Sequence, residues 1–172
     1  MIILITGTPC VGKSTIAKLL AEKINTEIID LKQIEKKHKI AEEKDIVIID
    51  ETKINSVVKK EIEKRKNYVI PSHLSQHVSP EIADYCFVLR CNPEILKERL
   101  KKRNYSKDKV EENVLCEILD SSLIESLEFK HKKHLYEINT TNKNPEKIVN
   151  EILEIIQKKK KPFFGEVKWK IE

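Results

Sequence analysis

One short segment near the start of the chain constrains its fold more than any other feature. Residues 7–14 read GTPCVGKS and match the pattern GxxxxGK[ST] at every fixed position. An apolar run at 2–6 precedes the segment, and residues 13–24 carry apolar side chains at helical spacing: Ile16, Leu19, Leu20 and Ile24. A short strand, a glycine-containing loop and a helix in this order predict a phosphate-binding loop on an α/β sheet.

Each fixed residue of this loop has a chemical reason to be there. Gly7 and Gly12 permit backbone conformations and a close approach that a Cβ atom would block. Backbone N–H groups then point at the phosphates, assisted by the N-terminus of the following helix. We expect Lys13 to place its charge on the β and γ oxygens, the Ser14 hydroxyl to bind Mg²⁺, and Thr15 to contact the α-phosphate.

Strand-like and helix-like segments alternate along the rest of the chain, which favours a parallel sheet covered by helices on both faces. Further strands are predicted at 27–30, 68–70, 84–90 and 134–140, and further helices at 54–62, 93–100, 110–129 and 145–156. Residues 31–44 are very polar and predict a short helix and a loop. Residues 158–172 combine four consecutive lysines with aromatic residues and predict an appendage to the core formed by 1–157.

Composition narrows the setting of the protein. The 172 residues suit one domain, and the net charge is +5. No apolar run approaches the ~20 residues that span a bilayer, and the N-terminus lacks a secretory pattern, so we expect a cytoplasmic protein with no membrane contact. The four cysteines form no CxxC pair, which favours buried thiols over a zinc site or disulfides.

The chain is too short for an oligomeric motor ATPase and lacks an NKxD guanine signature. It has instead a basic segment after the strand at 84–90, with Arg90, Arg99, Arg103, Lys107 and Lys109. Small nucleotide kinases use such a segment as a lid whose guanidinium groups neutralise the transferred phosphoryl group. An ordinary charged surface helix is the alternative.

Three strings carry a resemblance to a known family. The loop GTPCVGKST, the segment SHLSQ and the stretch FVLRCNPEILKERLKKRNYSKDKVEENVLCEIL resemble the adenylate kinase isoenzyme-six family, over roughly residues 2–156. The resemblance implies a P-loop fold with a five-stranded parallel sheet, nucleoside monophosphate (NMP) kinase activity with AMP the first candidate acceptor, and ATP hydrolysis. It also implies a role in small ribosomal subunit maturation and 16S rRNA processing, with a transient ribosomal protein partner.

The resemblance also assigns residues. It implies that Gly12, Lys13, Ser14 and Thr15 hold ATP, with Gly7 and Cys10 in the same loop. Arg103 should contact ATP from a lid at about 102–112, and Lys109 should lie close by. His73 corresponds to a loop histidine that assists hydrolysis, and about 30–53 corresponds to the NMP-binding region. A polar cap or loop contact is the alternative role for His73.

The chain departs from the family pattern at two places. Cys10 stands where the loop usually has glycine, which requires a negative φ or tolerated strain. Pro71 stands where relatives carry a metal-organising acid. Asp50 closes an apolar run and is either metal-linked, or substrate-side or structural.

Three functions fit these observations. The first is an adenylate kinase-like NMP kinase, and the second is an ATPase switch in ribosome assembly with little NMP kinase activity. The third, a small-metabolite kinase of the shikimate or cytidylate type, shares the loop but not the EN..CEI string. The basic aromatic tail at 158–172 either contacts rRNA through phosphate binding and stacking or docks on its own core.

Overall fold

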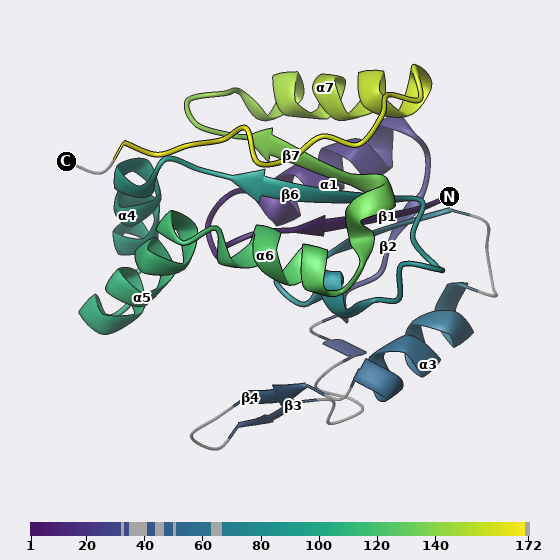
Figure 1. The fold of residues 1–172 in the computed structure, drawn as a ribbon, viewed down its shortest axis with the longest axis horizontal. Helices are drawn as coiled ribbons and strands as arrows, with labels where there is room; N and C mark the ends of the chain where they lie inside the picture. Colours follow the sequence, from purple (N-terminus) through teal and green to yellow (C-terminus); the bar gives the residue numbers. More distant parts are fainter. Residues whose placement is uncertain (32, 35–40, 44–46, 50, 63–66, 171–172) are drawn as a thin grey trace.

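A computed structural model describes residues 1–31, 33–34, 41–43, 47–49, 51–62 and 67–170. Its centre is the expected parallel five-stranded sheet, and the strands lie in the order β2-β5-β1-β6-β7 (Figure 1). The strands are β1 (Ile2–Thr6), β2 (Glu27–Ile28), β5 (Tyr68–Pro71), β6 (Tyr85–Arg90) and β7 (Leu135–Asn139). β1 pairs in parallel with β5 on one side and β6 on the other, so the loop that follows it leaves the middle of the sheet.

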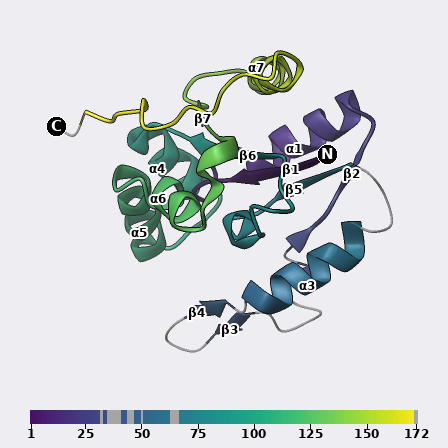
Figure 2. The ribbon, with the colours of Figure 1, turned by 45° about the vertical axis from the view of Figure 1, so that its right-hand side comes forward.

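Two hydrophobic clusters cover the two faces of this sheet, because side chains alternate along each strand. Ile3 and Ile5 of β1 pack with α1 (Lys13–Lys23), α4 (Pro93–Lys102) and α7 (Pro145–Gln157). Ile2 and Leu4 face the other way, toward α3 (Glu51–Ile62) and α6 (Ser121–Glu128). Figure 2 shows α7 and α3 on opposite sides of the sheet.

The helix predicted over 110–129 is wrong, because the chain forms two helices there. α5 (Lys107–Ile118) ends before Asp120, which has φ 57° and precedes α6. The Asp120 carboxylate and the Glu117 carbonyl oxygen both accept hydrogen bonds from the Arg90 guanidinium. These bonds fix the end of α5 and the turn that follows it.

The segment between β2 and β5 lies partly outside the described residues. Besides α3, its described parts include β3 (Ala41–Glu43) and β4 (Val47–Ile49), an antiparallel pair separate from the main sheet. A strand at 41–43 corrects the prediction of only helix and loop for 31–44. The NMP-binding region expected at 30–53 therefore has gaps, and Asp50 is one of the residues not described.

The tail after α7 runs back along the edge of the sheet (Figure 1). The Phe163 N–H donates to Leu135 O (3.2 Å), and the Glu137 N–H donates to Phe163 O (3.0 Å), which places Phe163 beside Tyr136 of β7. Phe163 packs against one core cluster and Phe164 against the other. Docking on the core, one of the two alternatives for the tail, is therefore observed.

Burial differs among the four cysteines. Cys86 and Cys91 are buried as expected, whereas Cys10 and Cys116 are only half-buried. Burial raises the pKa of Cys86 to about 12, which keeps its thiol protonated and unreactive. Across the described residues, the helices are too short or too polar to cross a membrane.

Candidate active site

The phosphate loop lies between β1 and α1 in a conformation that depends on its glycines. Gly7 has φ 133°, and a Cβ atom there would collide with the carbonyl oxygen of Leu89 on β6. Gly12 has φ 111° and is the N-cap of α1, where no side chain of the described residues caps the first turn. The first N–H groups of α1 therefore remain available to an anion.

Cys10 occupies the strained position of this loop. Its φ is 69°, a left-handed value that costs a non-glycine residue roughly 1–2 kcal/mol. The requirement for a negative φ is thus not met, and the loop tolerates the strain. Asn and Gly are commoner at such positions because they adopt left-handed backbone conformations at a lower energetic cost.

The Lys13 side chain folds back over the first residues of the phosphate loop. Its ammonium group donates to the carbonyl oxygens of Gly7 (2.5 Å) and Thr8 (2.9 Å). These contacts hold the charge at the mouth of the loop. A short reorientation of the flexible side chain would bring the same charge onto phosphate oxygens.

Two cavities meet at the phosphate loop. One, of about 220 Å³, has both charged and hydroxyl-bearing walls and is lined by Pro9, Cys10, Gly12, Lys13, Ser14, Thr15, Pro71, Ser72, His73, Arg103 and Tyr105. The other, of about 340 Å³, is lined by Cys10, Val11, Gly12, Thr15, Ile16, Arg99, Lys102, Arg103, Thr140, Lys143, Pro145 and Ile148. They share Cys10, Gly12, Thr15 and Arg103, so the two cavities adjoin at the phosphate loop.

The structure brings most of the expected site residues to these cavities, including His73 and Arg103. Arg103 is exposed at the C-terminal end of α4 and lines both cavities. Lys109 lines neither, and its ammonium group pairs with Glu112 on the surface of α5 (2.7 Å). Lys102 and Tyr105 were not singled out from the sequence, although both lie in the lid expected at 102–112, and Lys143 of the β7–α7 loop carried no signal there.

The loop that carries His73 is fixed by Gln76, another residue that sequence reasoning missed. Gln76 belongs to the short helix η1 (Ser75–His77), and its buried amide donates to His73 O (2.8 Å) and to Glu125 of α6 (2.7 Å). The Thr6 hydroxyl of β1 donates to the Gln76 side-chain oxygen (2.5 Å). These bonds hold the His73 backbone beside the end of β1.

Two histidines, His131 and His134, support the loop that carries His73 through a contact to Gln76. His131, at the start of η2 (His131–His134), lies with Nε2 2.9 Å from the Gln76 carbonyl oxygen and Nδ1 3.3 Å from His134 Nε2. A carbonyl only accepts, so Nε2 of His131 carries the proton and Nδ1 accepts from His134. Burial lowers the pKa of both histidines, which keeps them neutral.

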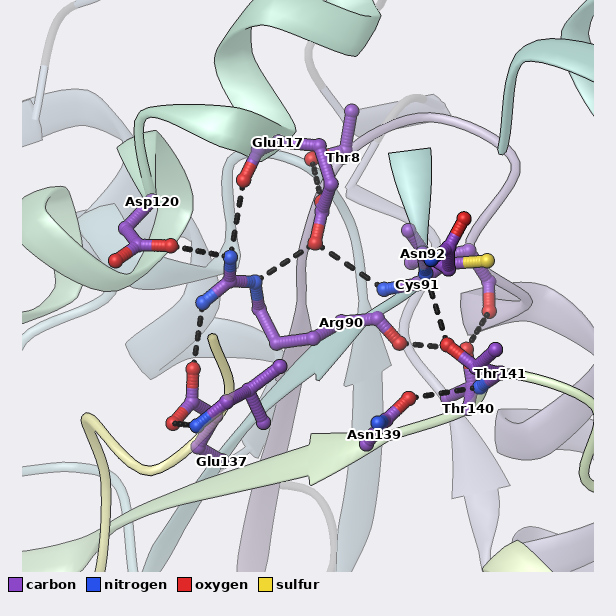
Figure 3. A network of polar contacts seen from close by, with 12 residues as sticks. Thr8, Arg90, Cys91, Asn92, Glu117, Asp120, Glu137, Asn139, Thr140 and Thr141 are labelled. Atoms are coloured by element: carbon purple, nitrogen blue, oxygen red, sulfur yellow. Dashed lines mark hydrogen bonds and ion pairs between the residues drawn. The ribbon is translucent and has the colours of Figure 1, made fainter. Parts of the chain in front are cut away.

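Arg90 is not part of a lid. Its side chain is 1% exposed at the end of β6 and is surrounded by three carboxylates (Figure 3). It donates from Nε to Glu117 (2.7 Å), from Nη1 to Glu137 (2.5 Å) and from Nη2 to Asp120. Burial by itself lowers the pKa of Arg90, but the carboxylates of Glu117 and Asp120 outweigh it and raise the pKa, so the guanidinium stays charged.

The tail completes this Arg90 cluster. The backbone N–H groups of Gly165, Glu166 and Val167 all donate to Glu137 Oε2, at 2.7, 3.1 and 3.3 Å. The ring of Trp169 lies over the guanidinium, with its centroid 5.7 Å from Arg90 Cζ. One cation alone would not balance three carboxylates, so the tail's donors stabilise the remaining charge.

The wall residues suit a cation only in part. The Ser14 hydroxyl is a hard oxygen donor of the kind that Mg²⁺ prefers. No carboxylate belongs to the described lining of the 220 Å³ cavity, and Pro71 lies there at the end of β5. The Ser14 hydroxyl therefore fits as one ligand of Mg²⁺.

Comparisons with known proteins agree with this geometry. A family model described as "AAA domain" matches residues 3–120. A "Putative adenylate kinase" of Methanocaldococcus jannaschii is 46% identical, covering 98% of this chain and 93% of the relative. One of Pyrococcus furiosus is 44% identical, covering 98% and 91%.

Solved structures show the same fold at low sequence identity. Deoxyadenosine kinase from M. mycoides with bound dATP superposes with a TM-score of 0.59 at 17% identity, over 91% of this chain and all of that chain. Shikimate kinase from Bacteroides thetaiotaomicron gives 0.56 at 17% identity, over 91% and 98%. Both confirm an α/β kinase fold and carry no information about the substrate of this chain.

Proposed function

The chain belongs to the family of archaeal proteins named "Putative adenylate kinase", and on that basis we propose that it transfers the γ-phosphoryl group of ATP to AMP. The observation that supports this most directly is the pair of adjoining cavities at the phosphate loop. The one with Lys13, Ser14, His73 and Arg103 suits phosphates. The larger one, between the loop and Thr140, suits the nucleoside of ATP.

In this mechanism the protein contributes position and charge. The N–H groups of the loop and the Lys13 ammonium hold the β and γ phosphates, while Arg103 approaches from the lid expected at 102–112. The bond from the γ phosphorus to its bridging oxygen breaks as a bond to an AMP phosphate oxygen forms. Mg²⁺, held by Ser14 and the phosphates, would neutralise the charge that develops on them.

His73 has a distinct proposed role. It lines the phosphate cavity while Gln76 fixes its backbone, so its imidazole lies where an attacking water could be oriented. We expect His73→Ala to reduce phosphate release without NMP by at least tenfold while reducing AMP phosphorylation less. An equal loss in both reactions would assign His73 to nucleotide binding instead.

The direct test is a coupled assay that measures ADP formation from ATP with each monophosphate in turn. We expect AMP to support the highest rate and Lys13→Ala to reduce it by at least a hundredfold. Lys18→Ala is a matched control, since Lys18 is an exposed lysine of the same helix that lines neither cavity. ADP formation that is independent of every monophosphate would reject the kinase function.

An ATPase switch in small-subunit maturation is the second candidate, favoured by a surface feature. Leu115 on α5, Leu119 just after it and Ile124 on α6 are 49–58% exposed, as in surfaces that bind protein partners. The tail could add rRNA contacts through Lys159 and Lys161, whereas Lys158 and Lys160 pair with Glu154. Co-sedimentation with small ribosomal subunits, with Leu119→Lys and Lys161→Gln as probes, tests this function.

A further inference from the structure

The phosphate loop is tied to the core at two side-chain hydrogen bonds. At its far end the Thr140 hydroxyl of the β7–α7 loop shares its one proton between Val11 O (3.1 Å) and Arg90 O (2.8 Å). At its near end the Thr8 hydroxyl donates to Glu117 Oε2 of α5 (2.5 Å). Thr8 is 4% and Glu117 1% exposed, so water does not compete for this second bond.

Glu117 is itself held from several directions (Figure 3). Its Oε1 accepts from Arg90 Nε (2.7 Å) and from the Cys91 N–H (3.1 Å), which leaves Oε2 directed at Thr8. Arg90 is fixed in turn by Asp120 and Glu137. The carboxylate therefore cannot turn away from the loop without breaking the Arg90 cluster.

Thr8 connects this fixed carboxylate to the lysine of the loop. A carboxylate only accepts, so the Thr8 hydroxyl must donate to it, and this sets the orientation of the Thr8 residue. The carbonyl oxygen of Thr8 accepts from Lys13 Nζ (2.9 Å). The chain Glu117–Thr8–Lys13 thus runs from the centre of the buried cluster to the charge at the mouth of the loop.

We infer that Glu117 is a positioning residue for phosphoryl transfer, acting through Thr8 on the loop and on Lys13. The inference rests on the proposed function, because it concerns the efficiency of that reaction. Glu117 does not line either cavity, so its effect passes through the loop. If Glu117 served only to join α5 to β6, replacing it would leave the rate of phosphoryl transfer unchanged.

The cluster offers a matched pair of charge-removing variants. Glu117→Gln and Asp120→Asn each remove one carboxylate bonded to Arg90, but only Glu117 bonds to Thr8. In Glu117→Gln the amide oxygen keeps the Arg90 and Cys91 donors, so the NH₂ group faces Thr8 and donates to its hydroxyl oxygen. The direction of the bond is then reversed, and the hydroxyl loses its carboxylate acceptor. Thr8→Val removes the hydroxyl at similar size, and Thr8→Ser keeps it.

We expect Thr8→Val and Glu117→Gln each to lower kcat/KM for ATP about tenfold, the usual worth of a buried hydrogen bond to a charged group. Asp120→Asn and Thr8→Ser should stay within about twofold of the unsubstituted protein. The double variant of Thr8→Val and Glu117→Gln should lose about tenfold, not a hundredfold, because both changes remove the same bond from the Thr8 hydroxyl to a carboxylate.

Trp169 reports independently on the cluster, because it is the chain's one tryptophan and lies over Arg90. Unchanged Trp169 emission in Thr8→Val would show that the cluster is intact while the loop is loosened. Equal losses in Asp120→Asn and Glu117→Gln, or multiplying losses in the double variant, would overturn the inference. An unsubstituted protein without phosphoryl transfer would instead reject the proposed function, and the two failures are therefore distinguishable.

Discussion

Gly7 and Gly12 both have a positive φ, but their surroundings differ. A Cβ atom on Gly7 would meet the Leu89 carbonyl oxygen, whereas one on Gly12 would meet no atom within 4 Å. We expect Gly12→Ala to cost only backbone strain, roughly 1–2 kcal/mol of unfolding free energy. Gly7→Ala adds a collision between β1 and β6 and should cost more than about 3 kcal/mol.

Urea denaturation of the two purified variants measures this difference. The Gly7→Ala protein should unfold at a clearly lower urea concentration with an unchanged slope. Equal midpoints for the two variants would contradict the packing of the phosphate loop against β6.

His131 and His134 make the free energy of unfolding fall as the pH falls, because their pKa values are lowered in the folded chain. Burial lowers both pKa values below the ordinary value of 6.5, so the unfolded chain binds protons at a higher pH than the folded chain. Stability is therefore complete above pH ~6.5 and falls below it, by up to about 1.4 kcal/mol per pH unit for each histidine. His131→Gln keeps a donor for the Gln76 carbonyl oxygen and should flatten the profile between pH 7 and 5. Denaturation profiles of equal slope would show that His131 is not the group that titrates.

At the scale of elements, the tail is a structural part of the sheet edge. Deleting 161–172 removes Phe163 and Phe164 from the two core clusters and three N–H donors from Glu137. Oε1 of Glu137 keeps Arg90, but Oε2 loses its three N–H donors and two rings leave the core, so we expect the unfolding free energy to fall by about 3–5 kcal/mol. Urea denaturation measures it, and Lys161→Gln, which alters an exposed side chain of the tail, should leave it unchanged. A truncated protein of unchanged stability would show that the tail docks without contributing to the fold.

Sequence pattern predicts those helices and strands that are determined by residues close to one another in the chain. The strand, loop and helix of the phosphate loop and the helix that Pro145 begins are of this kind. Arg90 is not, because its partners Glu117, Asp120 and Glu137 lie 27, 30 and 47 residues away. The spacing of basic residues placed Arg90 in a lid. The predicted 110–129 helix breaks at Asp120 for a related reason, because Arg90 bonds to Asp120 and to the Glu117 carbonyl oxygen. Gln76 was missed likewise, since nothing near it in the sequence shows that it is buried.

At the scale of the whole molecule, the site is assembled where parallel strands end. The loops after β1, β5 and β7 and the end of α4 each contribute to the two cavities, although they are far apart in the sequence. This is the usual place for a ligand in an open α/β sheet. A nucleotide bound there contacts several elements at once, and only the folded chain can offer those contacts together.

ATP should therefore stabilise the whole chain by mass action. At a concentration a hundred times its Kd, a ligand that binds only the folded state adds about 2.7 kcal/mol. For a chain of 172 residues this corresponds to a rise in Tm of about 5 to 10 °C, measurable by calorimetry with Mg²⁺ present. Lys13→Ala should abolish the rise, and Lys18→Ala should preserve it, because Lys18 lines neither cavity. A rise that survives Lys13→Ala would contradict the proposed role of Lys13 in holding the phosphates.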